Sequence, residues 1–234
     1  MLQPQKINPV WADSPCIVVA SGSSLTADVA RKVRFARWFD HWRVLVVNDA
    51  YRLLPYADIL YGCDWGWWKH HDGAPKFHGE RWTCHSNSMA FVDNKSAVVG
   101  TYDLRYVLAA NERGFSDDPR QIHYGLPQPS SGFQAVNLAL LMGASPIVMV
   151  GFDGHAKNGK HFFGEHPQHL NRGTDEGYRE FSKAYPPNDR IVNATPGSTI
   201  EAYRFVDLEA ILRDRRPDWN RPVIDARTGQ YSEA

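Results

Sequence analysis

The sequence lacks the features of a membrane, secreted or strongly basic protein. Its longest apolar runs, residues 16–20 and 146–150, fall far short of the roughly 20 residues of a membrane-spanning helix. Its first residues lack the basic-then-apolar pattern of a signal peptide. Its net charge is zero, with 26 basic and 26 acidic side chains, so no overall field attracts nucleic acid or anionic lipid. We therefore expect a cytoplasmic protein with no membrane partner, and a nucleic-acid partner is not expected.

Cysteine is scarce, and several common catalytic motifs are missing. The three cysteines, Cys16, Cys63 and Cys84, are odd in number and lie in or beside apparent strands. This pattern is typical of reduced thiols rather than a disulfide framework. The chain has no Gly-x-Ser-x-Gly elbow, no His-Glu-x-x-His pair, no Walker loop and no three-glycine dinucleotide fingerprint.

The apolar pattern that is present predicts an α/β protein. The 234 residues, 43% of them hydrophobic, suffice for one sizeable domain. Short apolar runs predict buried strands at residues 16–20, 44–47, 58–61, 147–150 and 190–193. Helical spacing and capping residues predict helices at residues 26–38, 131–142, 174–184 and 206–212. We predict a single Rossmann-like domain over residues 1–212, with helices on both faces of an open, mostly parallel sheet, and a polar tail over 213–234.

The middle of the chain, roughly residues 70–128, has a weaker pattern. We predict short strands at residues 81–85 and 97–100, followed by a variable connection up to residues 121–124, and this irregular stretch could carry an acceptor-specific insertion. The tryptophans of residues 64–68 favour a core or wall, although a ligand platform stays open.

Small or polar side chains follow four predicted strands. They are Ser21, Gly22, Ser23 and Ser24; Asn48 and Asp49; Gly62, Cys63 and Asp64; Gly151, Phe152 and Asp153. Because the carboxyl ends of parallel strands meet at one edge, this edge is the expected ligand site. Backbone N–H groups of the first loop could approach a phosphate, although an ordinary tight turn explains that loop equally well. Ser130, Ser131 and Gly132 begin a helix, either as a simple cap or facing the same crevice.

These motifs, taken together over residues 16 to about 212, resemble the bacterial sialyltransferases of glycosyltransferase family 42. They are also similar to the related family that includes the archaeal 6-hydroxymethylpterin diphosphokinase, and to phage-encoded proteins of this type. The block from Ser130 to Asp153 carries the most specific part of the resemblance. A phage origin would place the protein in the host cytoplasm.

The resemblance implies a nucleotide site and a catalytic histidine. The residues implied to hold the nucleotide are Ser21, Ser24, Asn48, Ser131, Gly132, Gly151 and Asp153, to which the same loops add Gly22, Asp49, Asp64 and Ser130. Two tyrosines that contact the departing phosphate in the sialyltransferases correspond to His155 and His161. The catalytic base corresponds to His166, nine residues before Asp175 in the pair Thr174-Asp175.

Two departures from the sialyltransferases bear on the donor. The first loop has serines where that family usually has asparagine and proline, and histidines replace both phosphate tyrosines. The donor therefore need not be a cytidine sugar. Three interpretations of the histidines between residues 155 and 169 stay open. They could be exposed side chains of a surface loop, they could contact the phosphate and act as a base, or they could bind a metal ion.

We expect a transferase that uses a nucleotide-activated donor, with a CMP-sugar as the leading candidate and a histidine as base. One alternative is diphosphate transfer from ATP, with Mg²⁺ held by Asp49, Asp64 or Asp153. Another is a nucleotide-binding accessory protein that has lost its chemistry. The acceptor and any homo-oligomer are not fixed by the sequence, and salt-dependent binding to duplex DNA would revive a nucleobase acceptor.

Overall fold

The computed structural model describes residues 3–86, 98–126, 130–170 and 174–214. Its strands are β1 (Cys16–Val19), β2 (Arg43–Val47), β3 (Ile59–Tyr61), β4 (Glu80–Ser86), β5 (Arg105–Ala110), β6 (Gln121–His123), β7 (Ile147–Val150) and β8 (Ile191–Asn193). Its helices are α1 (Ala27–Phe39), the 3-10 helix η1 (Asn48–Arg52), α2 (Trp65–His70), α4 (Ser131–Leu141), α5 (Asp175–Lys183) and α6 (Leu208–Arg213).

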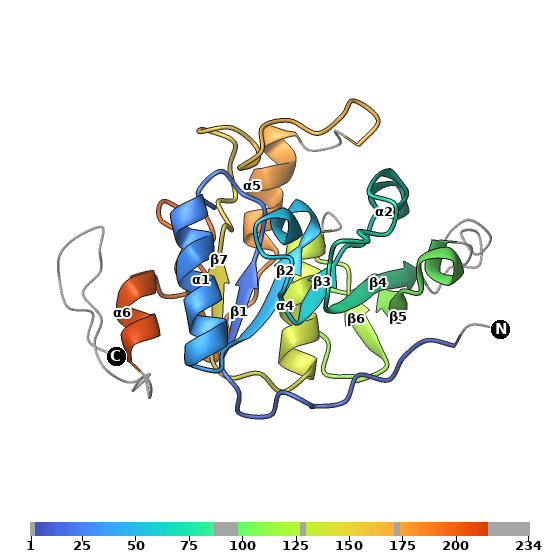
Figure 1. Ribbon diagram of the computed structural model, residues 1–234, viewed down its shortest axis with the longest axis horizontal. Coiled ribbons are helices and arrows are strands. Elements are labelled where there is room, and N and C mark those ends of the chain that lie inside the picture. Colours follow the sequence, from blue (N-terminus) through green and yellow to red (C-terminus); the bar gives the residue numbers. More distant parts are fainter. Residues whose placement is uncertain (1–2, 87–97, 127–129, 171–173, 215–234) are drawn as a thin grey trace.

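The strands form one parallel sheet in the order β6-β5-β4-β3-β2-β1-β7-β8. The chain adds strands in one direction from β1 to β6 and then returns to place β7 on the other side of β1. This arrangement confirms the predicted open, parallel α/β sheet of the Rossmann-like type. The reversal of strand order lies between β1 and β7 (Figure 1).

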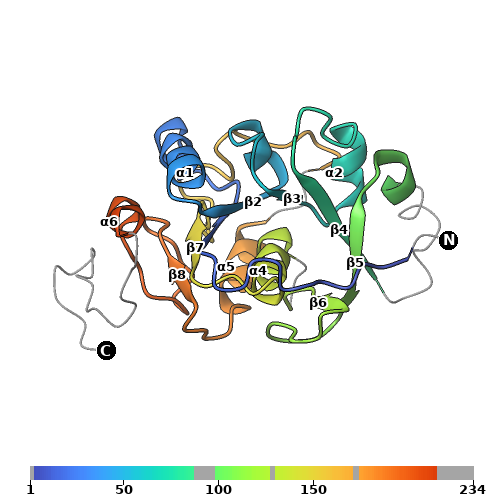
Figure 2. The ribbon, with the colours of Figure 1, turned by 60° about the horizontal axis from the view of Figure 1, so that its bottom comes forward.

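Helices cover both faces of the sheet, as predicted (Figure 2). Successive residues of β1 alternate between two buried clusters: Cys16 and Val18 face α4, while Ile17 and Val19 face α1. Since both faces are covered, all four residues of β1 are buried, which explains the continuous apolar run. Among the described residues, no helix has the length and apolar character needed to cross a membrane.

Sequence signals located the helix starts well. Thr26 is the N-cap of α1 and accepts a hydrogen bond from Val29 N at 3.2 Å. Ser130 and Thr174 are the N-caps of α4 and α5. Each hydroxyl accepts a backbone N–H that has no partner within the helix, so these residues begin helices efficiently.

The middle of the chain is more regular than the sequence indicated. Strands β4, β5 and β6 extend the sheet in register. The strand predicted at residues 97–100 is wrong, since residues 98–102 are helical and residue 97 lies outside the described residues. Val98 and Val99 have a strand-like composition, but they pack into the core on the α1 side as part of a helix, so tertiary packing overrides the local preference. Strand β5 and helix α2 were missed.

Candidate functional site

The carboxyl ends of β1 and β7 lie side by side at the point where strand order reverses. Val19 pairs with Val150 at the end of the ladder, so the loops after these strands lie side by side. In open α/β sheets this is the place where ligands bind, because strand ends and helix starts leave polar groups exposed. The site predicted from the sequence therefore begins here.

Asp153 joins these two loops. Its carboxylate accepts hydrogen bonds from Ser23 Oγ at 3.1 Å, Ser24 N at 3.1 Å and Ser24 Oγ at 2.8 Å. A Cβ added to Gly22 would lie 1.9 Å from Asp153 Oδ2, so only glycine permits this approach. Asp153 is 5% exposed, and its oxygens hold the first loop in place.

Ser21 and Gly151 also fix the shape of these loops. Ser21 Oγ donates to Val47 O at 2.9 Å and accepts from Ala50 N at 3.2 Å, which ties β1 to η1. Gly151 has a φ of +75°, and a Cβ there would lie 2.4 Å from Ala20 O. Ser21 and Gly151 therefore determine the conformation of these two loops. All of their described contacts are with other residues of the protein.

Asn48 is a stronger candidate for a ligand contact. Its backbone φ of +48° is uncommon for a residue other than glycine. Its Oδ1 is buried and has no hydrogen-bond partner among the described residues. A buried acceptor without a partner is costly, and here it lies at the ligand edge of the sheet. This oxygen can therefore accept a hydrogen bond from a bound molecule.

Asp49 is the centre of the site. It is 2% exposed, yet its carboxylate faces four side chains from three segments. Trp67 Nε1 donates to Oδ2 at 2.7 Å. The others are Arg52 NH1 at 3.5 Å, His71 Nε2 at 3.4 Å and His166 Nδ1 at 4.0 Å. A buried carboxylate is stable only when such donors surround it. The charge of Asp49 therefore depends on these four side chains, and Asp49 in turn holds them together.

His161 and His166 come together over this carboxylate. Their ring centroids are 4.6 Å apart, and Phe162 N donates to Ser21 O at 3.1 Å, which fixes the loop over the end of β1. Figure 1 shows the segment after β7 at the same end of the sheet as α2. The structure thus brings two of the three predicted catalytic histidines to the predicted edge.

Burial keeps both histidines neutral near neutral pH. Burial, followed by His166, lowers the pKa of His161 from 6.5 to about 4, against the opposing effect of Asp49. Burial also lowers the pKa of His166, while Asp49 and Glu165 raise it. A neutral imidazole can accept a proton, and a carboxylate beside it stabilises the resulting cation.

His71 belongs to the same cluster, although its role was missed in the sequence. Its Nδ1 lies 3.2 Å from Tyr51 Oη, opposite the Asp49 contact. Burial lowers its pKa more than Asp49 raises it. Its ring packs 4.3 Å from that of Trp67. Positions 67 and 71 share a helical face, so a helix predicted at 65–70 would have revealed the contact.

The start of α4 lies against the end of β3. Ser131 Oγ accepts from Cys63 N at 3.2 Å and lies 3.0 Å from Cys63 Sγ. A Cβ on Gly132 would lie 2.9 Å from Phe152. Ser130 caps α4, and Asp64 caps α2 by accepting from Gly66 N at 2.8 Å. The two helix starts therefore stand beside the same strand end.

His155 makes its described contacts elsewhere. Its Nε2 lies 3.2 Å from Gly197 O, and its Nδ1 accepts from Lys157 N at 3.3 Å. No described interaction joins it to Asp49 or to His166. The sequence placed His155 and His161 together on a departing phosphate, and the structure brings only His161 to the cluster.

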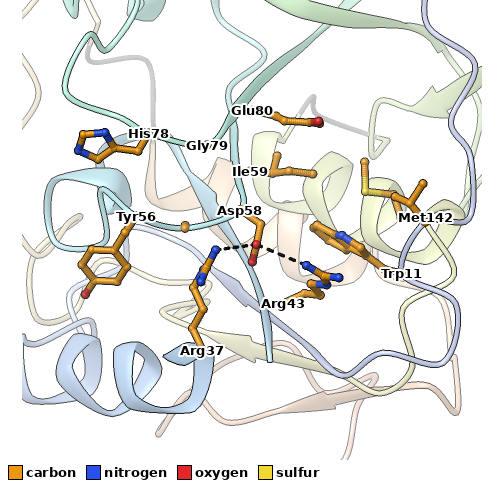
Figure 3. Close-up of a pocket in the computed structure, with 12 residues that line it drawn as sticks. Trp11, Arg37, Arg43, Tyr56, Asp58, Ile59, His78, Gly79, Glu80 and Met142 are labelled. Carbon is orange, nitrogen blue, oxygen red and sulfur yellow. Dashed lines mark hydrogen bonds and ion pairs between the residues drawn. The ribbon is translucent and has the colours of Figure 1, made fainter. Parts of the chain in front are cut away.

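A cavity of about 700 Å³ opens at the opposite edge of the sheet, at the amino ends of β2, β3 and β4 (Figure 3). Arg37 NH2 and Arg43 NH1 lie 2.8 and 3.7 Å from Asp58 Oδ1. Asp58 Oδ2 accepts from Val44 N at 2.8 Å, so these charges hold strands together. We assign the candidate site to the carboxyl edge, because its ionisable side chains converge on one buried carboxylate.

The carboxylates considered for Mg²⁺ do not form one ion site. Asp153 is held by serines, Asp64 by the start of α2, and Asp49 by Trp67 and its other neighbours. Among the described residues, no group of three or more histidine, cysteine, aspartate or glutamate side chains could hold a metal ion.

The chain was also compared with known proteins. No protein-family model matches it, and no curated protein matches it significantly.

Proposed function

We propose that the chain is a transferase that takes a group from a nucleotide-activated donor, of the glycosyltransferase type. The observation that carries the proposal is the cluster beside the reversal of strand order in which His166 faces the buried Asp49 and His161 packs against His166. The resemblance to the sialyltransferases supports a CMP-sugar as donor. Asn48 Oδ1 and the loop after β1 are the groups proposed to contact the nucleotide.

His166 acts as the general base in this proposal. Its Nδ1 faces Asp49, and no described residue hydrogen-bonds its Nε2. Nε2 accepts the proton of the acceptor hydroxyl while the hydroxyl oxygen bonds to the donor sugar carbon. The bond from that carbon to the phosphate oxygen breaks, and the electron pair leaves with the nucleoside monophosphate. Asp49 stabilises the imidazolium that forms.

The first experiment is a thermal-shift screen with CMP, CMP-sugars, UDP-sugars, and ATP with and without Mg²⁺. Stabilisation follows ligand concentration relative to Kd, and we expect it with a CMP or UDP compound. Stabilisation by ATP only with Mg²⁺ would favour the diphosphokinase alternative. Binding without turnover for any acceptor would favour the accessory-protein alternative, and no stabilisation at all would contradict a nucleotide site.

The second experiment separates the base from its neighbours. We expect His166→Ala to reduce turnover by roughly 10²–10⁴-fold with little change in donor affinity. His169, which is exposed and packs on His70 at 5.1 Å, provides the matched control. An essential His169 and a dispensable His166 would overturn the assignment.

A further inference from the structure

The cluster around Asp49 contains a fixed positive charge, the guanidinium of Arg52, which has no role in the catalytic steps described above. Arg52 is the last residue of η1 and lies at the carboxyl edge of β2. Its NH1 is 3.5 Å from Asp49 Oδ1, and its side chain is 51% exposed. The guanidinium carbon lies 5.5 Å from the ring centroid of Phe163. The residue is thus held on two sides while part of the guanidinium remains open to solvent.

The neighbouring groups do not supply the charge that a phosphate needs. Burial lowers the pKa of His71, of His161 and of His166, so these rings carry no positive charge near neutral pH. Lys160, on the same loop as His161, is paired with Glu165 at 3.2 Å. Asp49 and Asp64 contribute negative charge to the surroundings of His166. A departing phosphate in this setting needs a cation that is always charged.

Arginine meets that requirement in both charge and shape. Its guanidinium stays charged at any working pH and presents a planar fork that pairs with two phosphate oxygens. In the described part of the chain, no residue hydrogen-bonds the NH2 or Nε of Arg52. The stack of Arg52 on Phe163, and of Phe163 on His161 at 5.0 Å, places this fork beside the catalytic histidines.

We propose that Arg52, held by Asp49 and Phe163, binds the phosphate of the donor and of the departing nucleotide. The inference rests on the proposed function and names the residue that recognises its anionic part. Asp49 then has two tasks: it orients the proton-accepting His166, and it holds the phosphate-binding Arg52 within the same cluster. A buried carboxylate would otherwise repel the phosphate. These two tasks explain why Asp49 is nevertheless present in a site that binds an anion.

The test compares cytidine with CMP by calorimetry in the wild type and in Arg52→Gln. Wild type is expected to bind CMP about 10- to 100-fold more tightly than cytidine, the usual range for a charge-assisted hydrogen bond. Arg52→Gln is expected to remove this difference while cytidine affinity stays unchanged. Arg52→Lys, which keeps the charge and loses the fork, is expected to retain part of it. Inorganic pyrophosphate, a probe without a nucleoside, is expected to bind wild type and not Arg52→Gln.

Arg43→Gln is the matched control, because Arg43 is also half-exposed and forms a long ion pair with an aspartate at the other edge of the sheet. We expect it to bind every probe as wild type does. A CMP preference that survives in Arg52→Gln would overturn the inference and leave the proposed function standing. A wild type that binds neither CMP nor pyrophosphate would overturn both. Melting temperatures show whether each variant is folded, and Arg52→Lys provides the folded comparison if Arg52→Gln is not.

Discussion

Asp153→Ala should destabilise the protein rather than act mainly on ligand affinity. The resemblance gives Asp153 a nucleotide-binding role, but the structure engages both of its oxygens with Ser23 and Ser24. Removal of the carboxylate leaves three donors of the first loop without their partner. It also leaves a gap above Gly22, whose missing side chain permits this packing.

The magnitude follows from these contacts. A hydrogen bond to a charged group contributes about 1.5–3 kcal/mol. Ser23 and Ser24 are half-buried, so water replaces part of each lost bond, and we take about 1 kcal/mol for each of the three. The expected loss is therefore about 2–4 kcal/mol of unfolding free energy, a large share of the usual 5–15 kcal/mol. Asp153→Asn keeps one acceptor oxygen and should lose about half as much.

Urea denaturation at neutral pH measures this loss, with Asp117→Ala as the control. Asp117 is exposed and makes no described side-chain contact, so its substitution should change stability by less than about 0.5 kcal/mol. If Asp153→Ala is as stable as Asp117→Ala and instead binds CMP more weakly, Asp153 contacts the nucleotide and the structural interpretation fails.

Three further predictions concern the same edge of the sheet. Gly22→Ala places a methyl group 1.9 Å from Asp153 Oδ2 and 2.5 Å from Gly151 O, and should cost about 1–3 kcal/mol in denaturation; an unchanged melting temperature would reject the close packing. Trp67→Phe removes the buried Nε1 donor to Asp49 and should lower the unfolding free energy by about 1–3 kcal/mol. An unchanged unfolding free energy would show that water replaces this hydrogen bond and that the bond does not stabilise the fold. The pKa of His161 falls from 6.5 in the unfolded chain to about 4 in the folded protein, so its contribution to stability is present above pH 6.5 and is lost as pH falls toward 4. The pH dependence of the unfolding free energy should be shallower across that window in His161→Asn, and identical slopes would contradict the burial of His161.

The sequence predicted those helices and strands that are determined by neighbouring residues, such as a buried apolar run or a hydroxyl cap. Apolar runs in β1 and β7 are continuous because both faces of the sheet are covered. Hydroxyl caps marked the starts of α1, α4 and α5. Strand β5 was missed because the short apolar run of residues 106–110 does not by itself distinguish a strand from a helix; its pairing with β4 and β6 makes it a strand. The helix at residues 98–102 was missed because its composition favours a strand.

In the candidate site, too, some features follow from the sequence and others depend on tertiary packing. The strand-end residues could be expected at one edge, because parallel topology alone brings them there. Their partners could not be predicted, since Asp49 meets His71 and His166 through tertiary packing of η1, α2 and the loop after β7. Of the histidines predicted in the loop after β7, His166 lies at this edge beside Asp49. His155 does not, because its ring contacts Gly197 O instead.

Histidine NMR during a CMP titration tests the central claim that the cluster over Asp49 faces the nucleotide. The imidazole signals of His161 and His166 should shift together and saturate with CMP concentration. The signal of His78, which lines the cavity at the opposite edge, should stay in place. Saturable CMP binding that moves His78, or that leaves both His161 and His166 unmoved, would contradict the claim.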